Sequence, residues 1–240
     1  MPTAAIILCD DLGHRLSDEH GAYEELYERL INPSFAAVTP FDIEVYRAHE
    51  GELPVDLGRL DLIVVGGSRA GVYEDHPWIQ PLLSFIRSAH TARVNLVGIC
   101  FGHQAVAAAL GAKVTPFEGG WNLARHEYRV DASAFGLSAG DVLGLNAFHR
   151  DQVREVPTGT EVFLSSDRCA IAGLVGEHLL TFQPHPEFSA SLTESLLAAG
   201  EGIRFADEEL ADARARLKGD LSNEVISATI RTFTAHRAVV

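Results

Sequence analysis

Short apolar runs alternate in the first half of the chain with segments whose apolar residues recur at helical spacing. A run of about four to eight apolar residues, bounded by polar residues or glycine, indicates a buried strand. Such runs occupy Ala4–Cys9, Leu60–Gly67 and Val94–Ile99, and Phe41–Ala48 alternates between apolar and polar residues as a strand does. Helical spacing is found over Ala22–Ile31, His76–His90 and Gln104–Gly111, with Gly111 as the stop. The alternation predicts a mostly parallel sheet with helices on both faces.

The pattern changes after Lys113. Between Lys113 and Phe182, short apolar strands follow one another through turns rich in glycine, proline and aspartate, which predicts an antiparallel extension of the sheet. From Ser189 onward the spacing is helical again. We therefore predict an α/β fold, with one domain over residues 1–190 and a C-terminal helical extension, residues 191–240, packed on it.

Composition narrows the classes of partner. The chain of 240 residues has a formal net charge of −14 and no cluster of basic residues, so no nucleic-acid partner is expected. No apolar run reaches the roughly 18 residues of a membrane span. The cysteines Cys9, Cys100 and Cys169 are widely separated, which implies no disulfide framework and favours a reducing, cytoplasmic location. We find no spacing of metal ligands.

The segment Gly98-Ile99-Cys100-Phe101-Gly102 lies between a predicted strand and a predicted helix. A sharp strand-to-helix turn lifts a side chain clear of the sheet and places it at the positive end of the helix, which favours a thiolate. Small residues on both sides relieve crowding in such a turn. Cys100 is therefore a candidate nucleophile, although a small buried cysteine fits the same segment. Cys9 and Cys169 lack this context, and we expect them to be structural.

His185 stands out among eleven histidines because Pro184 and Pro186 flank it and Glu187 follows closely. A carboxylate in that position can accept the Nδ1 proton and leave Nε2 facing a thiol. Taken alone, the segment is better explained as a surface turn that ends a strand. Together with the turn at Cys100, the catalytic interpretation is favoured.

Gly98–Gln104 and Pro184–Phe188 together resemble the class I glutamine amidotransferase family, above all the glutaminase part of GMP synthases and its stand-alone relatives. The resemblance implies the flavodoxin-like fold of class I glutaminases for the catalytic domain, residues 1–190. It makes Cys100 the nucleophile, His185 the general base and acid, and Glu187 the carboxylate that orients the histidine. No metal or other cofactor is implied.

The resemblance also implies an oxyanion hole formed by the N–H groups of Phe101 and Gly67, with Gly66 as a flexible neighbour that helps to bind the substrate. A plain strand-to-loop turn is the alternative for the two glycines. Many relatives have proline after them, whereas this chain has Ser68-Arg69. The resting shape of this loop therefore stays open.

Further substrate-binding positions follow from the same resemblance. Gln104 matches a glutamine that hydrogen-bonds the substrate. His149 and Asp151 match a segment that lies over the amino-acid end of the substrate, although a core or surface histidine fits His149 as well. We take Arg69 or Arg125 as a candidate partner for a substrate carboxylate.

Three functions remain open at this stage. The chain is a glutaminase that releases ammonia for a separate synthetase subunit, a stand-alone hydrolase or peptidase of γ-glutamyl compounds, or an idle binding module. The intact set of candidate residues disfavours the last. No phosphate-binding loop of the G-x-x-x-x-G-K-[ST] type is present, so we expect no activation of an acceptor by ATP. The C-terminal helices could cover a sheet edge, form a homodimer or bind a partner.

Overall fold

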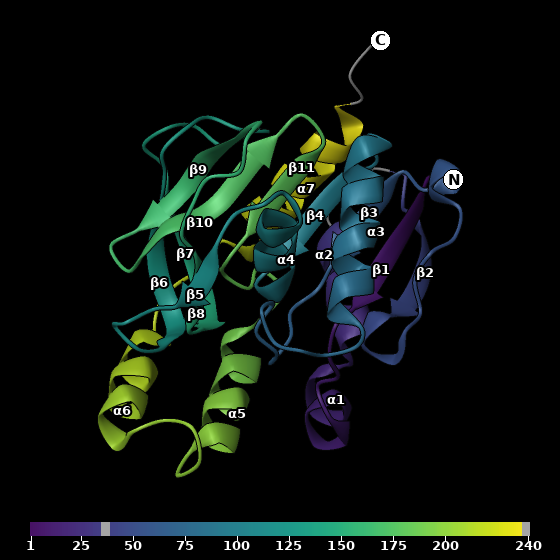
Figure 1. The fold of residues 1–240 in the computed structure, drawn as a ribbon. Helices are drawn as coiled ribbons and strands as arrows, with labels where there is room; N and C mark the ends of the chain where they lie inside the picture. Colours follow the sequence, from purple (N-terminus) through teal and green to yellow (C-terminus); the bar gives the residue numbers. More distant parts are fainter. Residues whose placement is uncertain (35–38, 237–240) are drawn as a thin grey trace.

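The structure is a computed structural model that describes residues 1–34 and 39–236. Within these ranges, nine strands form one sheet in the order β2-β1-β3-β4-β11-β10-β9-β6-β7 (Figure 1). Its parallel half consists of β1 (Thr3–Leu8), β2 (Asp42–Arg47), β3 (Leu62–Val65), β4 (Asn95–Ile99) and β11 (Leu179–Phe182). The strands β3, β4 and β11 are buried along their whole length, as expected for parallel strands covered on both faces.

The antiparallel half continues the sheet beyond β11. It consists of β6 (Asn122–Val130), β7 (Val142–His149), β9 (Thr160–Ser166) and β10 (Cys169–Gly176). A separate small pair joins β5 (Val114–Pro116) to β8 (Asp151–Val153). The predicted antiparallel extension is thus confirmed, with the exception that its last strand, β11, also pairs parallel with β4.

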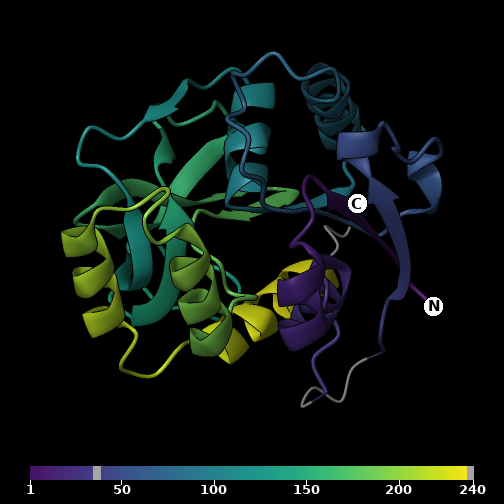
Figure 2. The ribbon, with the colours of Figure 1, turned by 90° about the horizontal axis from the view of Figure 1, so that it is seen from below.

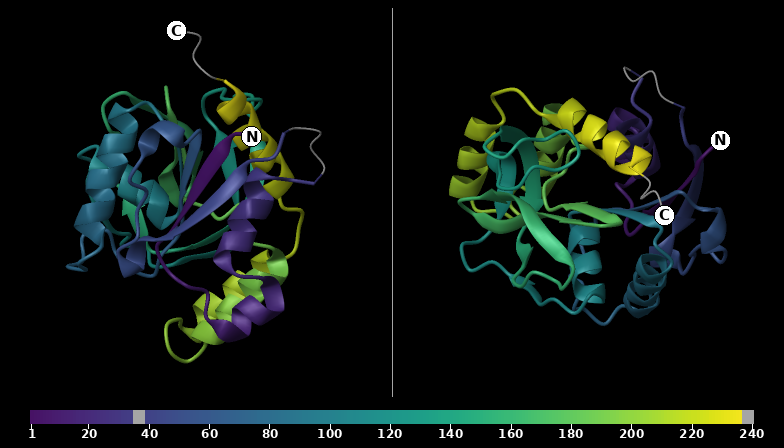
Figure 3. Two further views of the ribbon diagram at one scale, coloured as in Figure 1. Left: turned by 90° about the vertical axis from the view of Figure 1, so that its right-hand side faces the viewer. Right: turned by 90° about the horizontal axis from the view of Figure 1, so that it is seen from above.

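Helices cover both faces of the parallel half. On one face lie α2 (Tyr23–Ile31) and α7 (Asn223–Ala235), and on the other lie α3 (Ile79–Thr91) and α4 (Phe101–Ala109) (Figure 3). Successive side chains of a strand point to opposite faces, so β1 contributes to two cores. Ile6 packs with α2 and α7, whereas Ile7 packs with α3 and α4. The predicted α/β fold class is confirmed.

Three further helices gather at one end of the molecule: α1 (His14–His20), α5 (Ala190–Gly200) and α6 (Asp207–Arg216) (Figures 1 and 2). This is the end at which β1, and hence each strand parallel to it, finishes. Leu16 of α1 and Leu192 of α5 pack around Phe188, and Leu197 and Leu210 anchor α5 and α6 on β6. The division of the chain at residue 190 stays a prediction.

Two details differ from the sequence pattern. The helix α1 has one buried residue, Leu16, in seven, so it shows no apolar periodicity. The helix α3 begins at Ile79 rather than at His76, and Pro81 lies in its first turn, where a missing N–H costs no hydrogen bond. Short 3-10 turns, η1 (Ala48–Glu50) and η2 (Leu57–Arg59), separate β2 from β3. No helix in the described ranges is long and apolar enough to cross a membrane.

Candidate active site

Three loops meet at one edge of the sheet because β3, β4 and β11 are neighbours. Gly66 and Gly67 follow β3, Cys100 follows β4, and His185 comes shortly after β11. Carboxyl ends of parallel strands share an edge, and ligand sites of open α/β sheets gather there. The parallel pairing of β11 with β4 therefore brings the two predicted catalytic segments together from distant parts of the chain.

Cys100 forms the turn between β4 and α4. Its φ and ψ are 52° and −105°, a conformation that is strained for a residue with a side chain. A Cβ on Gly102 would lie 2.0 Å from the carbonyl oxygen of Val65, and one on Gly98 would lie 2.7 Å from that of Gly102. Glycine at 102 therefore lets the turn pack against the end of β3, and glycine at 98 lets β4 and the first turn of α4 approach each other closely.

His185 lies in the loop after β11 and faces Cys100. Its Nδ1 donates to Oε1 of Glu187 at 2.7 Å, and its ring stacks on Phe188 with centroids 4.0 Å apart. The N–H of His185 donates to the carbonyl of Asn146 at 2.7 Å, and the Asn146 side chain donates to the carbonyl of Phe188. Since Nδ1 is bound to a carboxylate, Nε2 is the nitrogen left for the hydrogen bond with the Cys100 thiol.

The charges around His185 favour its protonated form. Burial lowers the pKa of a histidine, but the sulfur of Cys100 and the carboxylate of Glu187 outweigh burial and raise the pKa of His185 to about 10. A protonated imidazole beside the sulfur suits a thiolate nucleophile. Cys9 and Cys169 are buried, and burial raises the pKa of both thiols, so they have the inert character of core cysteines.

The two predicted oxyanion donors differ in their surroundings. Phe101 is the first residue of α4, and the N–H groups of a first helical turn have no acceptor inside the helix. The N–H of Gly67 instead donates to the hydroxyl of Tyr27 at 2.8 Å. A Cβ on Gly67 would stand 3.2 Å from Cε1 of His185, and one on Gly66 would stand 2.8 Å from the ring of Tyr27. Both glycines thus allow close packing at the site.

Gln104, His149 and Asp151 line the cavity that contains the thiol. The Gln104 amide donates to the Asp151 carbonyl at 3.0 Å and to Oε1 of Gln183 at 3.1 Å. Nδ1 of His149 donates to the same Asp151 carbonyl at 3.1 Å. Burial and the nearby His185 lower the pKa of His149 to about 3, so its ring is neutral. Its Nε2 has no hydrogen-bond partner among the described residues.

The cavity has a volume of about 750 Å³ and extends from the thiol to α5 and the segment that joins α5 to α6. An apolar wall, formed by Trp121, Phe148, Leu196, Ile203 and Phe205, lines this extension. The centroids of its aromatic rings lie 5.3 to 6.3 Å apart. Sequence reasoning missed this wall because its residues come from distant segments, and each has the pattern of an ordinary core residue.

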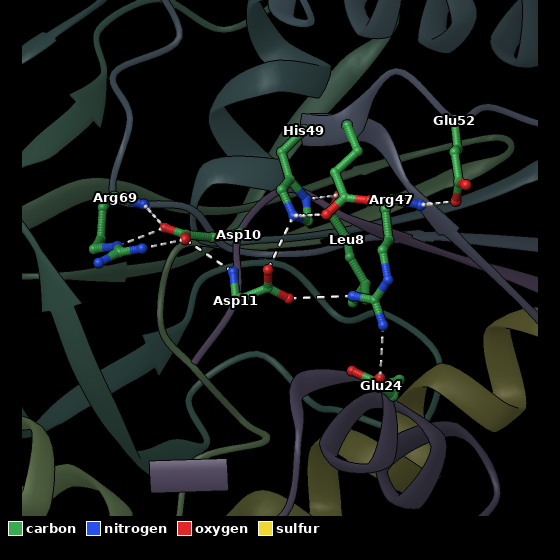
Figure 4. A network of polar contacts seen from close by, with 9 residues as sticks. Leu8, Asp10, Asp11, Glu24, Arg47, His49, Glu52 and Arg69 are labelled. Atoms are coloured by element: carbon green, nitrogen blue, oxygen red, sulfur yellow. Dashed lines mark hydrogen bonds and ion pairs between the residues drawn. The ribbon is translucent and has the colours of Figure 1, made fainter. Parts of the chain in front are cut away.

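Of the two arginines considered for a substrate carboxylate, Arg69 lines the cavity. Its N, Nε and Nη2 donate to the carboxylate of Asp10 at 2.6 to 2.9 Å, so its guanidinium already has an anionic partner (Figure 4). Arg125 donates to the carbonyl of Asp220 instead.

A second group of polar residues includes Asp11, which lines the cavity. Asp11, His49 and Glu50 place potential metal ligands within 4.8 Å of one another, the one such group in the described part of the chain. Arg47 joins Asp11 to Glu24 at 3.1 and 3.2 Å, and His49 contacts Asp11 at 3.2 Å (Figure 4). Asp11 therefore has both Arg47 and His49 as partners.

Comparison with known proteins identifies the family of this chain. The model of the class I glutamine amidotransferase family matches residues 25–203. A glutamine amidotransferase-like protein from Schizosaccharomyces pombe is 28% identical over 182 residues, covering 74% of this chain and 73% of that protein. Gamma-glutamyl peptidase 2 from Arabidopsis thaliana is 28% identical over 178 residues, covering 70% and 71%. The crystal structure of a glutamine amidotransferase from Thermotoga maritima superposes with a TM-score of 0.72 at 20% identity, over 97% of this chain and 96% of that one. The chain belongs to the class I glutamine amidotransferase family.

Proposed function

We propose that this chain is a cysteine hydrolase that cleaves the side-chain amide of glutamine, or of a γ-glutamyl compound, through a thioester on Cys100. The observation that carries the proposal is the arrangement of Cys100, His185 and Glu187. The sulfur stands on a strained turn, the imidazole is hydrogen-bonded to it, and the carboxylate holds the far nitrogen of the imidazole. Family membership supports the same chemistry.

The reaction proceeds in two halves. The Cys100 thiolate attacks the amide carbon, and the carbonyl electrons move to the oxygen, which the Phe101 N–H stabilises. The C–N bond then breaks as His185 gives its Nε2 proton to the leaving nitrogen, which yields a γ-glutamyl thioester and ammonia or an amine. Neutral His185 next takes a proton from water, whose oxygen attacks the thioester carbon, and the C–S bond breaks to release glutamate and the thiolate. Glu187 keeps the proton on Nδ1 throughout.

Side chains beside the thiol position the substrate. The Nε2 of His149 is an acceptor because its Nδ1 carries the proton, so it suits the α-ammonium group of a glutamyl substrate. Two hydrogen bonds from its amide nitrogen hold the Gln104 side chain near His149. Its amide oxygen is left to accept a hydrogen bond from the substrate.

The size of the cavity favours a second, narrower function, the hydrolysis of γ-glutamyl peptides. Pockets of about 300–1,000 Å³ take drug-sized ligands. A volume of about 750 Å³ therefore leaves space beyond a glutamine, and that space has the apolar wall. When glutamine is the substrate, the leaving group is ammonia and needs no such space. When a γ-glutamyl peptide is the substrate, the leaving group is an amino acid, which would fill the space. Similar proteins include gamma-glutamyl peptidase 2 from Arabidopsis thaliana.

The test is turnover by the purified full chain, with glutamine and γ-glutamyl dipeptides as substrates and Cys100→Ala as the blank. We expect turnover to require Cys100, and Glu187→Gln to lower kcat by up to about 10⁴-fold, because the wrong tautomer of His185 is then favoured. Rapid dipeptide cleavage supports the peptidase function, and weak turnover of glutamine alone supports a glutaminase subunit of a separate synthetase. Equal rates for wild type and Cys100→Ala would refute both.

A further inference from the structure

The N–H of Gly67 points into the protein core. It donates to the hydroxyl of Tyr27 at 2.8 Å, and Tyr27, on α2, is 1% exposed. The cavity that contains the Cys100 thiol is lined by the neighbouring Ser68 and by Tyr23 of the same helix. The amide expected to complete the oxyanion hole is therefore bound to a core hydroxyl.

An oxyanion donor must come within about 2.7–3.1 Å of the oxygen that becomes charged. The Gly67 N–H can reach such an oxygen only if its hydrogen bond to Tyr27 is given up. The peptide between Gly66 and Gly67 has no side chain on either flank, so no Cβ restricts the backbone dihedrals about which it would turn. The peptide, rather than the tyrosine, is the part that can turn.

The ring of Tyr27 is held in place from two sides. Gly66 packs so closely against it that a Cβ there would lie 2.8 Å away. On the other side Tyr27 stacks on Tyr23 at 5.9 Å, Tyr23 stacks on Phe188 at 6.4 Å, and Phe188 stacks on His185 at 4.0 Å. A continuous aromatic stack thus fixes the Tyr27 hydroxyl relative to the catalytic histidine.

We propose, on the basis of the function proposed above, that Tyr27 is a positioning residue for the oxyanion hole. Its hydroxyl holds the Gly67 amide in a resting orientation, and the Gly66–Gly67 peptide turns toward Cys100 as the tetrahedral intermediate forms. The hydrogen bond to Tyr27 is then a cost of reaching the transition state. The wild-type chain works below the rate that its triad allows.

Tyr27→Phe tests the proposal because it removes the acceptor and keeps the ring and its stacking. We expect kcat for glutamine and for γ-glutamylalanine to rise about 2- to 10-fold, the range that one net hydrogen bond supplies. KM should stay unchanged, because the oxyanion exists only in the transition state. Tyr128→Phe is the matched control: Tyr128 is equally buried, on β6, and loses the same hydroxyl.

A lower kcat in Tyr27→Phe would show that the hydroxyl holds a productive loop, and an unchanged kcat would show a structural role only. Either result overturns the proposal. Hydrogen exchange of the Gly67 amide, followed by NMR in the full chain, gives an answer independent of turnover. We expect protection in the wild type and in Tyr128→Phe, and its loss in Tyr27→Phe. Equal protection in all three overturns the proposal, whereas failure of the proposed function appears separately, as turnover that does not need Cys100.

Discussion

Gly102 shows how far the turn at Cys100 depends on single atoms. Its α-carbon packs against the end of β3, and an added Cβ would lie 2.0 Å from the carbonyl oxygen of Val65. That oxygen belongs to the backbone and cannot move aside as a flexible side chain can. We predict that Gly102→Ala lowers the free energy of unfolding by about 1–3 kcal/mol, the usual range for overpacking.

The measurement is thermal unfolding, in which each kcal/mol shifts Tm by roughly 2–4 °C in a chain of this size. The catalytic rate should fall as well, because the turn that carries Cys100 must shift. Gly58→Ala is the control: Gly58 is exposed in η2, and a Cβ there would approach only the side chain of Asp56. A Gly102→Ala variant as stable as Gly58→Ala would contradict the packing described for the turn.

At the scale of elements, the sequence predicts the strands and helices whose own residues show an apolar run or a helical spacing of apolar positions. The apolar run Ala4–Cys9 and the amphipathic segment Ala22–Ile31 are found as β1 and α2. The polar helix α1 and the three-residue strands β5 and β8 could not be predicted, because they contain too few apolar positions for any period.

The same reasoning applies to the candidate site. Cys100 and His185 are marked by local motifs, whereas the parallel pairing of β11 with β4, which brings them together, differs from the antiparallel extension that the sequence predicts. The contact of Tyr27 with Gly67 joins α2 to the loop after β3, and the sequence of neither segment indicates that the two are in contact. Contacts of this kind depend on packing and are visible only in the folded chain.

Asp10 and Arg69 connect two neighbouring elements, the end of β1 and the loop after β3. Burial raises the pKa of the Asp10 carboxyl, but the hydrogen bonds and charge of Arg69 outweigh it and hold this pKa below its usual range. A lowered pKa means that the stabilisation is complete above the unfolded-state value of about 3.9 and is lost as pH falls through the folded-state value. We predict that Asp10→Asn costs about 1–2 kcal/mol at pH 7, because charge-assisted hydrogen bonds are lost at a partly exposed site.

Urea unfolding at pH 7, 5, 4 and 3 measures the stability that Asp10→Asn removes. The difference in unfolding free energy between wild type and Asp10→Asn should be constant from pH 7 to about pH 5 and should shrink below pH 4. Asp42→Asn removes an exposed carboxylate from β2 and should stay within about 0.5 kcal/mol of wild type at each pH. A difference for Asp10→Asn that does not change with pH would argue against the ion pair as its cause.

At the scale of the whole molecule, the cavity combines two parts of the fold. The loops after the parallel strands supply the thiol and the imidazole, and α5, the segment that joins α5 to α6, and the antiparallel half supply the apolar wall. The candidate catalytic residues Cys100 and His185 therefore stand at one side of the cavity, and the apolar wall stands at the other. In the proposed function, the chemistry and the choice of leaving group depend on different elements, so a substitution in the wall is expected to change one without the other.

Ile203 provides the cleanest test of this separation. Its side chain lines the cavity yet is 81% exposed, so its replacement does not weaken the core. We predict that Ile203→Ser raises KM for γ-glutamylphenylalanine about 3- to 10-fold, because a side chain of this size contributes roughly 1 kcal/mol when it is partly buried by a ligand. KM for glutamine should stay the same, since loss of ammonia leaves that side of the cavity empty. Val55→Ser, at a fully exposed site that does not line the cavity, is the control for surface hydrophobicity. An equal change in KM for both substrates would mean that Ile203 acts on the glutamyl end, and the apolar wall would then not be the site of the leaving group.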